Sequence, residues 1–152
     1  MQRRLTLHRG GREIQLAFFG RGHTAGDVVV YLPAERVLVT GDLLTAGVPY
    51  MGDAYVPEWI ETLEALKALD VEVILPGHGA AFEGVAKIGY LQAYLRDLWR
   101  EASALHAAGV SAPEAAKKID MTAHAEHFPE ISGPGVSEHA VERIYELLDG
   151  GS

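Results

Sequence analysis

Cysteine is absent from this chain of 152 residues. Its absence excludes disulfide bonds, thiolate nucleophiles and zinc bound by thiolates. A metal ion bound by this sequence must therefore be held by imidazole, carboxylate or water.

Long apolar runs are absent too. No stretch approaches the roughly 18 consecutive apolar residues of a membrane-spanning helix, and the first residues, Met-Gln-Arg-Arg-Leu-Thr-Leu-His, lack the apolar core of a signal peptide. The sequence therefore predicts no membrane partner and favours a cytoplasmic location.

Positive charge is scarce, with 13 Lys and Arg against 21 Asp and Glu and a formal net charge of −8. Nucleic acids and anionic membrane surfaces both require clustered Lys and Arg, so neither is expected as a partner. The small basic cluster at Arg3, Arg4, Arg9 and Arg12 is interpreted as the solvated ends of strands.

What the chain does contain is an ordinary globular composition, with 48% hydrophobic and 22% charged residues. At this length one compact core is expected. We therefore predict a single domain over residues 1–152, made of a region 1–80 with the sheet and the candidate metal motifs and a helical region 84–150.

Runs of β-branched and apolar residues between turn signals predict the strands of this domain. Gly10-Gly11 between the first two runs indicates a hairpin. The next two runs are apolar at successive positions, which is typical of strands covered on both faces. The expected strands are Leu5–His8, Arg12–Phe19, Asp27–Leu32, Arg36–Thr40 and Val71–Leu75.

Helical periodicity marks the remaining elements. A helix opens at Pro57, and a long amphipathic helix with a stripe from Ile88 to Leu105 ends near Gly109. Ser111 to Glu114 indicates a capping box that starts a short helix, residues 121–136 indicate a loop, and Ser137 is the expected cap of a last helix. Strands followed by helices in this order predict an α/β fold with a mixed sheet.

Three short phrases each place one metal-capable side chain beside glycine. Residues 22–27 are Gly-His-Thr-Ala-Gly-Asp, residues 40–44 Thr-Gly-Asp-Leu-Leu, and residues 75–79 Leu-Pro-Gly-His-Gly. Because all three flank strand ends, His23, Asp42 and His78 are expected to converge at one edge of the sheet. Two imidazoles and one carboxylate can bind zinc, although a catalytic zinc ion usually has three protein ligands and water.

In order and spacing these phrases resemble the third, fourth and fifth metal motifs of the metallo-β-lactamase superfamily. The resemblance implies an αβ/βα sandwich and a metal-dependent hydrolase that attacks an ester, thioester, lactam or phosphoester of a small-molecule substrate. It implies that His23 binds one metal ion, that His78 binds a second, and that the catalytic Asp42 bridges both. It also implies Zn²⁺ as cofactor, with Fe or Mn as alternatives. Thr24 and Asp27 are placed to orient the His23 loop through local hydrogen bonds.

The family's His-x-His-x-Asp-His motif is absent, so the resemblance covers only the C-terminal half of the fold. The implied partner is the N-terminal half or a second copy of this chain in a homodimer. Either partner requires an exposed apolar flank on this chain. With half of the ligands missing, it is also open that no metal binds this chain alone.

Two other functions remain open. One is a non-catalytic half-fold module that forms a homodimer or binds a separate N-terminal half, with His23, Asp42 and His78 only holding loops. The other is an iron-dependent oxygenase or redox relative of the same fold, because imidazole and carboxylate suit iron as well as zinc.

Other side chains have mainly structural interpretations. His124 and His127 could share a metal at their i, i+3 spacing, but packing or surface roles are favoured. His8 and His106 are expected to be solvated and His139 to make a structural contact. Tyr50, Tyr55 and Trp59 either line a substrate pocket or pack beneath the Asp42 loop, which is the favoured interpretation.

Overall fold

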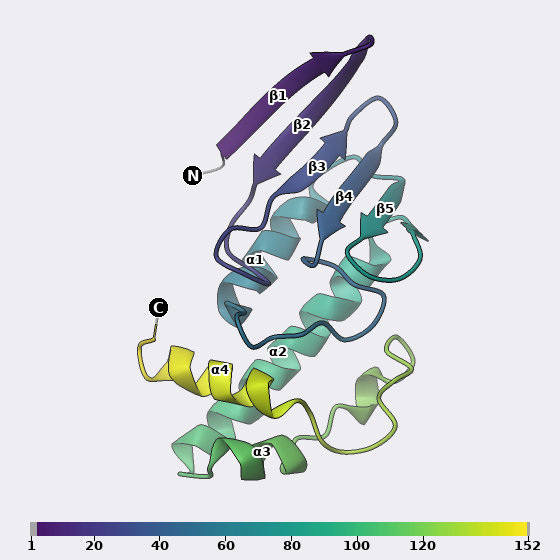
Figure 1. Cartoon of the computed structure of the whole chain (residues 1–152). Helices are drawn as coiled ribbons and strands as arrows, with labels where there is room; N and C mark the ends of the chain where they lie inside the picture. The colour runs from purple at the N-terminus through teal and green to yellow at the C-terminus, as the bar shows by residue number, and fades with distance from the viewer. Residues whose placement is uncertain (1–2, 152) are drawn as a thin grey trace.

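The computed structural model describes residues 3–151 as a six-stranded sheet with helices packed against it (Figure 1). The strands lie in the sheet in their sequence order. Strands occupy β1 Arg3–Arg9, β2 Arg12–Phe18, β3 Val29–Leu32, β4 Val37–Gly41, β5 Val73–Pro76 and β6 Phe82–Glu83. Helices occupy α1 Val56–Lys67, α2 Ala86–Ala107, α3 Ala112–Lys118 and α4 Glu138–Leu148, with a 3-10 turn η1 at Thr122–His124.

Strand pairing makes the sheet mixed, as expected for an α/β fold. Neighbouring strands are antiparallel except β4 and β5, which are parallel and joined through α1. β3 starts two residues later than expected, and so does β5. β6 was not expected, because two residues carry no readable period.

The β1–β2 hairpin turns at Gly10 and Gly11, whose φ angles are +59° and +77°. Two central residues with positive φ define a type I′ turn, whose twist matches that of the flanking strands. The expected hairpin is confirmed, and the full register from Arg3 opposite Phe18 to Arg9 opposite Arg12 follows from it.

One face of the sheet packs against the helices (Figure 1). Val29, Tyr31, Leu38, Thr40 and Ile74 alternate along β3, β4 and β5 and are buried there. The apolar stripes of α1 and α2 supply the other side of this core.

The opposite face is apolar but open, which corrects the expectation that these strands are covered on both faces. A row of paired residues crosses five strands on this face, formed by Leu5, Leu16, Val30, Val39 and Leu75. Each is half-buried or exposed, with 57% of Leu5 accessible. A run of consecutive apolar residues in a strand shows that both faces of the strand are apolar, but it does not show which other elements cover each face. Residues of this helix-free side are referred to below as the open face.

The helical region follows the expected pattern with two corrections at helix starts. Ser111 Oγ donates to Glu114 Oε2 at 3.1 Å, and its side chain makes no cap to the backbone of α3. The Ser137 side chain likewise makes no hydrogen bond to α4. Both helices nevertheless start at the expected residues. Because α3 starts without a side-chain cap, Pro113 in its first turn and tertiary packing are enough to start it.

Residues 119–137, which connect α3 to α4, are a loop apart from η1. His124 in this loop and His106 on α2 make more contacts with other residues than the sequence indicated. His124 is buried and its Nε2 lies 2.8 Å from Asp97 Oδ2. His106 was expected to be solvated, but its side chain is 30% exposed and packs edge-on against Tyr145. Within residues 3–151 no helix combines the length and apolarity needed to cross a membrane.

The C-terminus of α2 ends at a glycine with positive φ, and this conformation can be tested by mutation. Gly109 has φ +73°, its N–H bonds to the His106 carbonyl at 2.9 Å, and the Val110 N–H bonds to the Leu105 carbonyl at 3.0 Å. This is a Schellman motif. We expect Gly109→Ala to lower the free energy of unfolding by about 1 kcal/mol in urea titrations, because alanine is strained at positive φ.

Gly89 is the matched control on the same helix. It has helical φ and open space where a Cβ would project. Gly89→Ala should therefore raise the free energy of unfolding by about 0.5–1 kcal/mol. Changes of the same sign in both variants would contradict this account of the α2 terminus.

Candidate functional site

His23, Asp42 and His78 line one hollow of about 250 Å³. His23 comes from the loop before β3, Asp42 from the end of β4 and His78 from the end of β5. The fold therefore brings together three side chains that are 19 and 36 residues apart. The remaining lining residues are Thr45, Gly47, Val48, Pro49 and Tyr50.

The His23 loop is held by the carboxylate of Asp27. Asp27 Oδ2 accepts the backbone N–H of Thr24 at 2.9 Å, and Oδ1 accepts the Thr24 hydroxyl at 2.8 Å. The Thr24 hydroxyl in turn accepts the Gly26 N–H at 3.2 Å. A short polar side chain that bonds its own loop in this way fixes the backbone that directly follows His23.

The Asp42 and His78 loops pack directly on each other. The Gly77 N–H bonds to the carbonyls of Gly41 and Leu44 at 2.9 and 3.1 Å. A Cβ at Gly77 would overlap the Asp42 carboxylate and the Gly41 backbone. Glycine at 77 is therefore required for the contact in which His78 Nε2 lies 3.3 Å from Asp42 Oδ1.

Trp59 contacts both the loop that carries His23 and the loop that carries Asp42. Its fully buried indole donates Nε1–H to the Leu43 carbonyl at 3.2 Å. The His23 ring meets it edge-on, with ring centroids 5.7 Å apart. The interpretation of Trp59 as packing beneath the Asp42 loop agrees with this burial.

Arg21 fixes the chain just before His23. Its guanidinium donates to both carboxylate oxygens of Glu58 on α1 and lies over the Tyr55 ring, 4.1 Å from the centroid. The hydrogen bond to Glu58 raises the pKa of Arg21 further above its ordinary value. Tyr55 thus packs outside the hollow, whereas Tyr50 lines it.

The wall of the hollow depends on a residue that sequence reasoning missed. The carboxylate of Glu130, in the segment between α3 and α4, accepts the N–H of Val48. A Cβ at Gly47 would collide with that carboxylate. Since the partners are 82 residues apart, no local period or spacing could have indicated the contact.

The donor set fits a metal centre only in part. Two ligands of a tetrahedral zinc ion, each about 2.1 Å from it, lie about 3.4 Å apart, and the distance of 3.3 Å between Asp42 Oδ1 and His78 Nε2 is close to that value. Within residues 3–151, however, no group of three His, Asp or Glu side chains could hold an ion together. His124 and His127 form no such group either, since one bonds to Asp97 and the other stacks on Tyr90.

Comparison with known proteins gives a consistent family. The model of the metallo-beta-lactamase superfamily matches residues 1–78. The metallo-beta-lactamase type 2 of Elizabethkingia meningoseptica is 35% identical over 75 residues, which is 45% of this chain and 30% of that protein. The chain thus matches less than a third of this curated relative.

Solved structures extend the likeness to the helices. A metallo-beta-lactamase from Pontibacter korlensis superposes with a TM-score of 0.55 at 28% identity, covering 62% of this chain and 46% of that one. A metallo-beta-lactamase family protein from Thermus thermophilus reaches 0.67 at 21% identity, covering 96% of this chain and 48% of that one. Nearly the whole chain thus shares a fold with about half of the second protein.

The His23 loop yields a prediction that needs no bound metal. We expect Asp27→Ala to lower the free energy of unfolding by roughly 1–2 kcal/mol, because it removes both acceptors of Thr24. Amide hydrogen exchange should speed up at residues 22–26 before it does elsewhere. Asp53→Ala, at an exposed carboxylate of the next loop, should change stability by less than about 0.5 kcal/mol. Equal protection of the His23 loop in both variants would contradict the assignment.

Proposed function

Because the chain belongs to the metallo-beta-lactamase superfamily, we propose that it acts as a metal-dependent hydrolase whose metal ligands are divided between this chain and a complementary half of the fold. The observation that carries the proposal is the convergence of His23, Asp42 and His78 on one hollow. The complementary half supplies the remaining ligands, whether it lies on the same polypeptide or on another.

In this proposal Asp42 is the central ligand, with His78 beside it and His23 across the same hollow. Asp27 and Thr24 orient His23. The chemistry that a bound Zn²⁺, or Fe or Mn in its place, supplies is activation of water for attack on an ester, thioester, lactam or phosphoester. Tyr50 at the edge of the hollow is placed to contact the substrate.

The open face of the sheet supports the need for a complementary half. The strands β1 to β5 contain about five residues each on average, and at roughly 4.8 Å between strands and 3.3 Å per residue they outline roughly 400 Å². Contiguous apolar patches of a few hundred Å² or more mark interaction sites. The row from Leu5 to Leu75 runs across the middle of this area.

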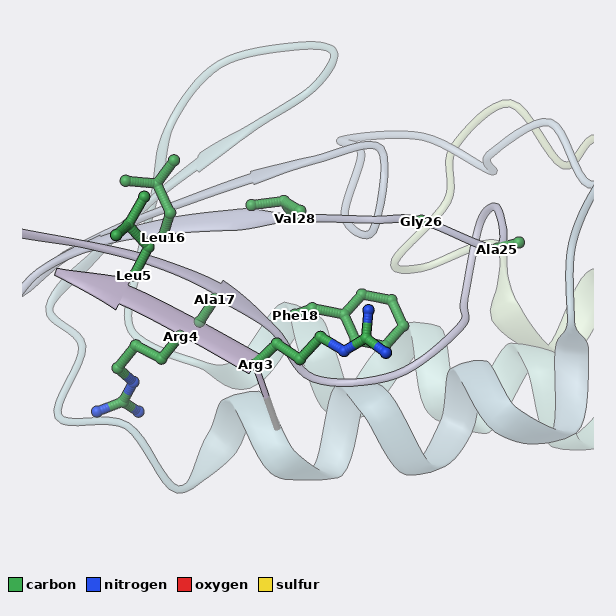
Figure 2. Close-up of a pocket in the computed structure, with 9 residues that line it drawn as sticks. All are labelled: Arg3, Arg4, Leu5, Leu16, Ala17, Phe18, Ala25, Gly26 and Val28. Atoms are coloured by element: carbon green, nitrogen blue, oxygen red, sulfur yellow. The ribbon is translucent and has the colours of Figure 1, made fainter. Parts of the chain in front are cut away.

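A hollow of about 510 Å³ lies between the β1–β2 hairpin and the segment before β3, and Figure 2 shows the residues that line it. Leu5, Leu16, Phe18 and Val28 contribute apolar side chains, and Arg3 and Arg4 lie beside them on β1. A partner whose apolar side chains fill this hollow would bury its apolar lining residues, as the second sheet of a sandwich buries the inner face of the first.

The Thermus thermophilus protein supports a complementary half as the partner that covers the open face, because about half of that protein has no counterpart in this chain. That structure aligns with 96% of this chain but extends over about twice its length. We therefore infer that the open face binds a segment with the fold of that other half. A second copy of this chain is the competing occupant.

A non-catalytic module is the second candidate function. It is favoured by one observation, that no group of three potential ligands can hold an ion within residues 3–151. In that case His23, Asp42 and His78 only hold loops together, and the open face serves assembly.

Metal content separates the two functions. The purified chain is dialysed against zinc and then against buffer, and bound zinc per chain is measured by mass spectrometry. We expect Asp42→Ala to retain about tenfold less zinc than His127→Ala, because Asp42 is the shared ligand whereas His127 stacks on Tyr90. Equal retention would refute the ligand assignment, and zero zinc in the unmodified chain both alone and with the complementary half added would favour the module.

The open face is tested by association. Sedimentation velocity over a range of concentrations should show self-association or, with the complementary half added, a one-to-one complex. Leu5→Glu places a charge on the open face and should weaken association by about tenfold or more. Tyr90→Glu, at an exposed aromatic residue on α2, is the control and should leave association unchanged. A monomer at all concentrations that also ignores the complementary half would rule out the interface.

A further inference from the structure

A short segment after β4, residues 45–48, joins the candidate site to the helical region and is called the linking segment below. On the site side, the Ala46 N–H bonds to the His78 carbonyl at 2.9 Å. On the other side, the Val48 N–H donates to the carboxylate of Glu130, which lies in the connection between α3 and α4. Two hydrogen bonds at positions two residues apart therefore relate His78 to a carboxylate from a distant part of the chain.

Close packing accompanies both hydrogen bonds. A Cβ at Gly79 would collide with the Cβ of Ala46, so Ala46 rests directly on the loop after β5. A Cβ at Gly47 would collide with the Glu130 carboxylate on the opposite side. The buried Thr45 donates its hydroxyl to the Gly47 carbonyl at 2.8 Å and closes the turn between them. Because the turn is closed and in contact on both sides, we expect the linking segment to move as one unit.

The backbone of Glu130 is held in place by the packing of its own connection. Phe128, two residues earlier, is fully buried and packs against Tyr94 on α2, with ring centroids 5.4 Å apart. The Ile131 N–H bonds to the Phe128 carbonyl at 3.0 Å and closes a turn around Glu130. Burial lowers the pKa of Lys87 on α2, and the nearby charge of Glu130 opposes that shift. The carboxylate thus projects from a defined backbone, as a group that positions another must.

We propose that Glu130 is a positioning residue of the candidate site, which holds the linking segment against the loop that carries His78. The bond from Ala46 is the one backbone hydrogen bond that His78 itself makes within residues 3–151. Its Nε2 lies 3.3 Å from Asp42 Oδ1, so a shift of this loop changes the spacing of the two side chains. Val48 lines the same hollow, so the bond to Glu130 also fixes one of its walls.

The consequence for metal binding rests on the proposed function, whereas the placement of the His78 loop does not. Groups that orient a metal ligand from outside the coordination sphere typically change metal affinity by about 10- to 100-fold when they are removed. Glu130 acts on His78 through an intervening segment, so we expect a smaller factor of about fivefold.

Amide hydrogen exchange of the metal-free chain tests the placement itself, measured by NMR methods for rapidly exchanging amides. Glu130→Ala removes the acceptor of Val48, so exchange at Val48 should speed up by about fivefold. Exchange at Ala46 should speed up by about threefold as well, although this amide bonds to His78 and not to Glu130. Glu130→Gln keeps a side-chain oxygen as acceptor and should restore most of the protection at both amides.

Gly47→Ala is an independent variant that leaves the Glu130 side chain intact. Gly47 does not have positive φ, and the three atoms nearest to an added Cβ all belong to the Glu130 carboxylate. We expect Gly47→Ala to speed up exchange at Ala46 by about threefold, and to have little further effect in the Glu130→Ala chain, where the collision is absent. Gly133→Ala is the control on the same connection, because an added Cβ there meets open space.

Zinc retention extends the test to the proposed function. With the complementary half added, Glu130→Ala should retain about fivefold less zinc than the unmodified chain, and Glu130→Gln about the same amount. Glu126→Ala removes an exposed carboxylate from the same connection and should retain zinc fully. If the unmodified complex holds no zinc, the hydrolase proposal fails, and amide exchange still decides the role of Glu130.

Three results would overturn the positioning role. They are unchanged exchange at Ala46 in the Glu130→Ala chain, equal effects of Glu130→Gln and Glu130→Ala, and an effect of Gly47→Ala that is the same with and without the Glu130 carboxylate. Exchange at Leu95, fully buried on α2, separates local from global opening. Equal acceleration at Leu95 and Ala46 in both the Glu130→Ala and Gly47→Ala chains would mean general destabilisation and would also overturn it.

Discussion

The burial of Trp59 is the interaction on which the arrangement of the site depends. Its indole lies between the loop before β3 and the loop after β4, and it donates a hydrogen bond to the Leu43 carbonyl. Burying a tryptophan removes about 200 Å² from water, which stabilises the fold by roughly 5 kcal/mol. Since Trp59 also lies on α1, the crossover between β4 and β5, its position determines where the chain returns to place His78. One buried side chain thus fixes two site loops directly and the third through the crossover.

Sequence reasoning predicted the features that are local. Gly10 and Gly11 indicated the hairpin, and Gly109 indicated the end of α2, because positive φ is a property of one residue. The convergence of His23, Asp42 and His78 was also predictable, because each follows or precedes a strand end of one sheet. Metal binding by these three side chains stays a prediction, which the zinc measurement tests.

The features that sequence reasoning missed are tertiary. Glu130 reaches Val48 across 82 residues, and the orientation of Tyr94 depends on packing by the connecting segment. His106 was misread as solvated because its partner Tyr145 lies on a helix 39 residues away. Apolar runs in β3 and β4 indicated apolar surroundings but could not show that no element within residues 3–151 covers one side of the sheet.

The β1 strand forms one free edge of the sheet, and arginine residues lie near both of its ends. If two copies paired their β1 strands antiparallel about Thr6, Arg3 would face Arg9 of its mate and Arg4 would face His8. Repulsion between Arg3 and Arg9 opposes this edge-to-edge growth, and charged side chains on edge strands are one way in which natural sheets resist aggregation. The molecule can therefore expose a long edge strand and an apolar layer together, with edge-to-edge growth into fibres disfavoured and the flat of the sheet left for the proposed association.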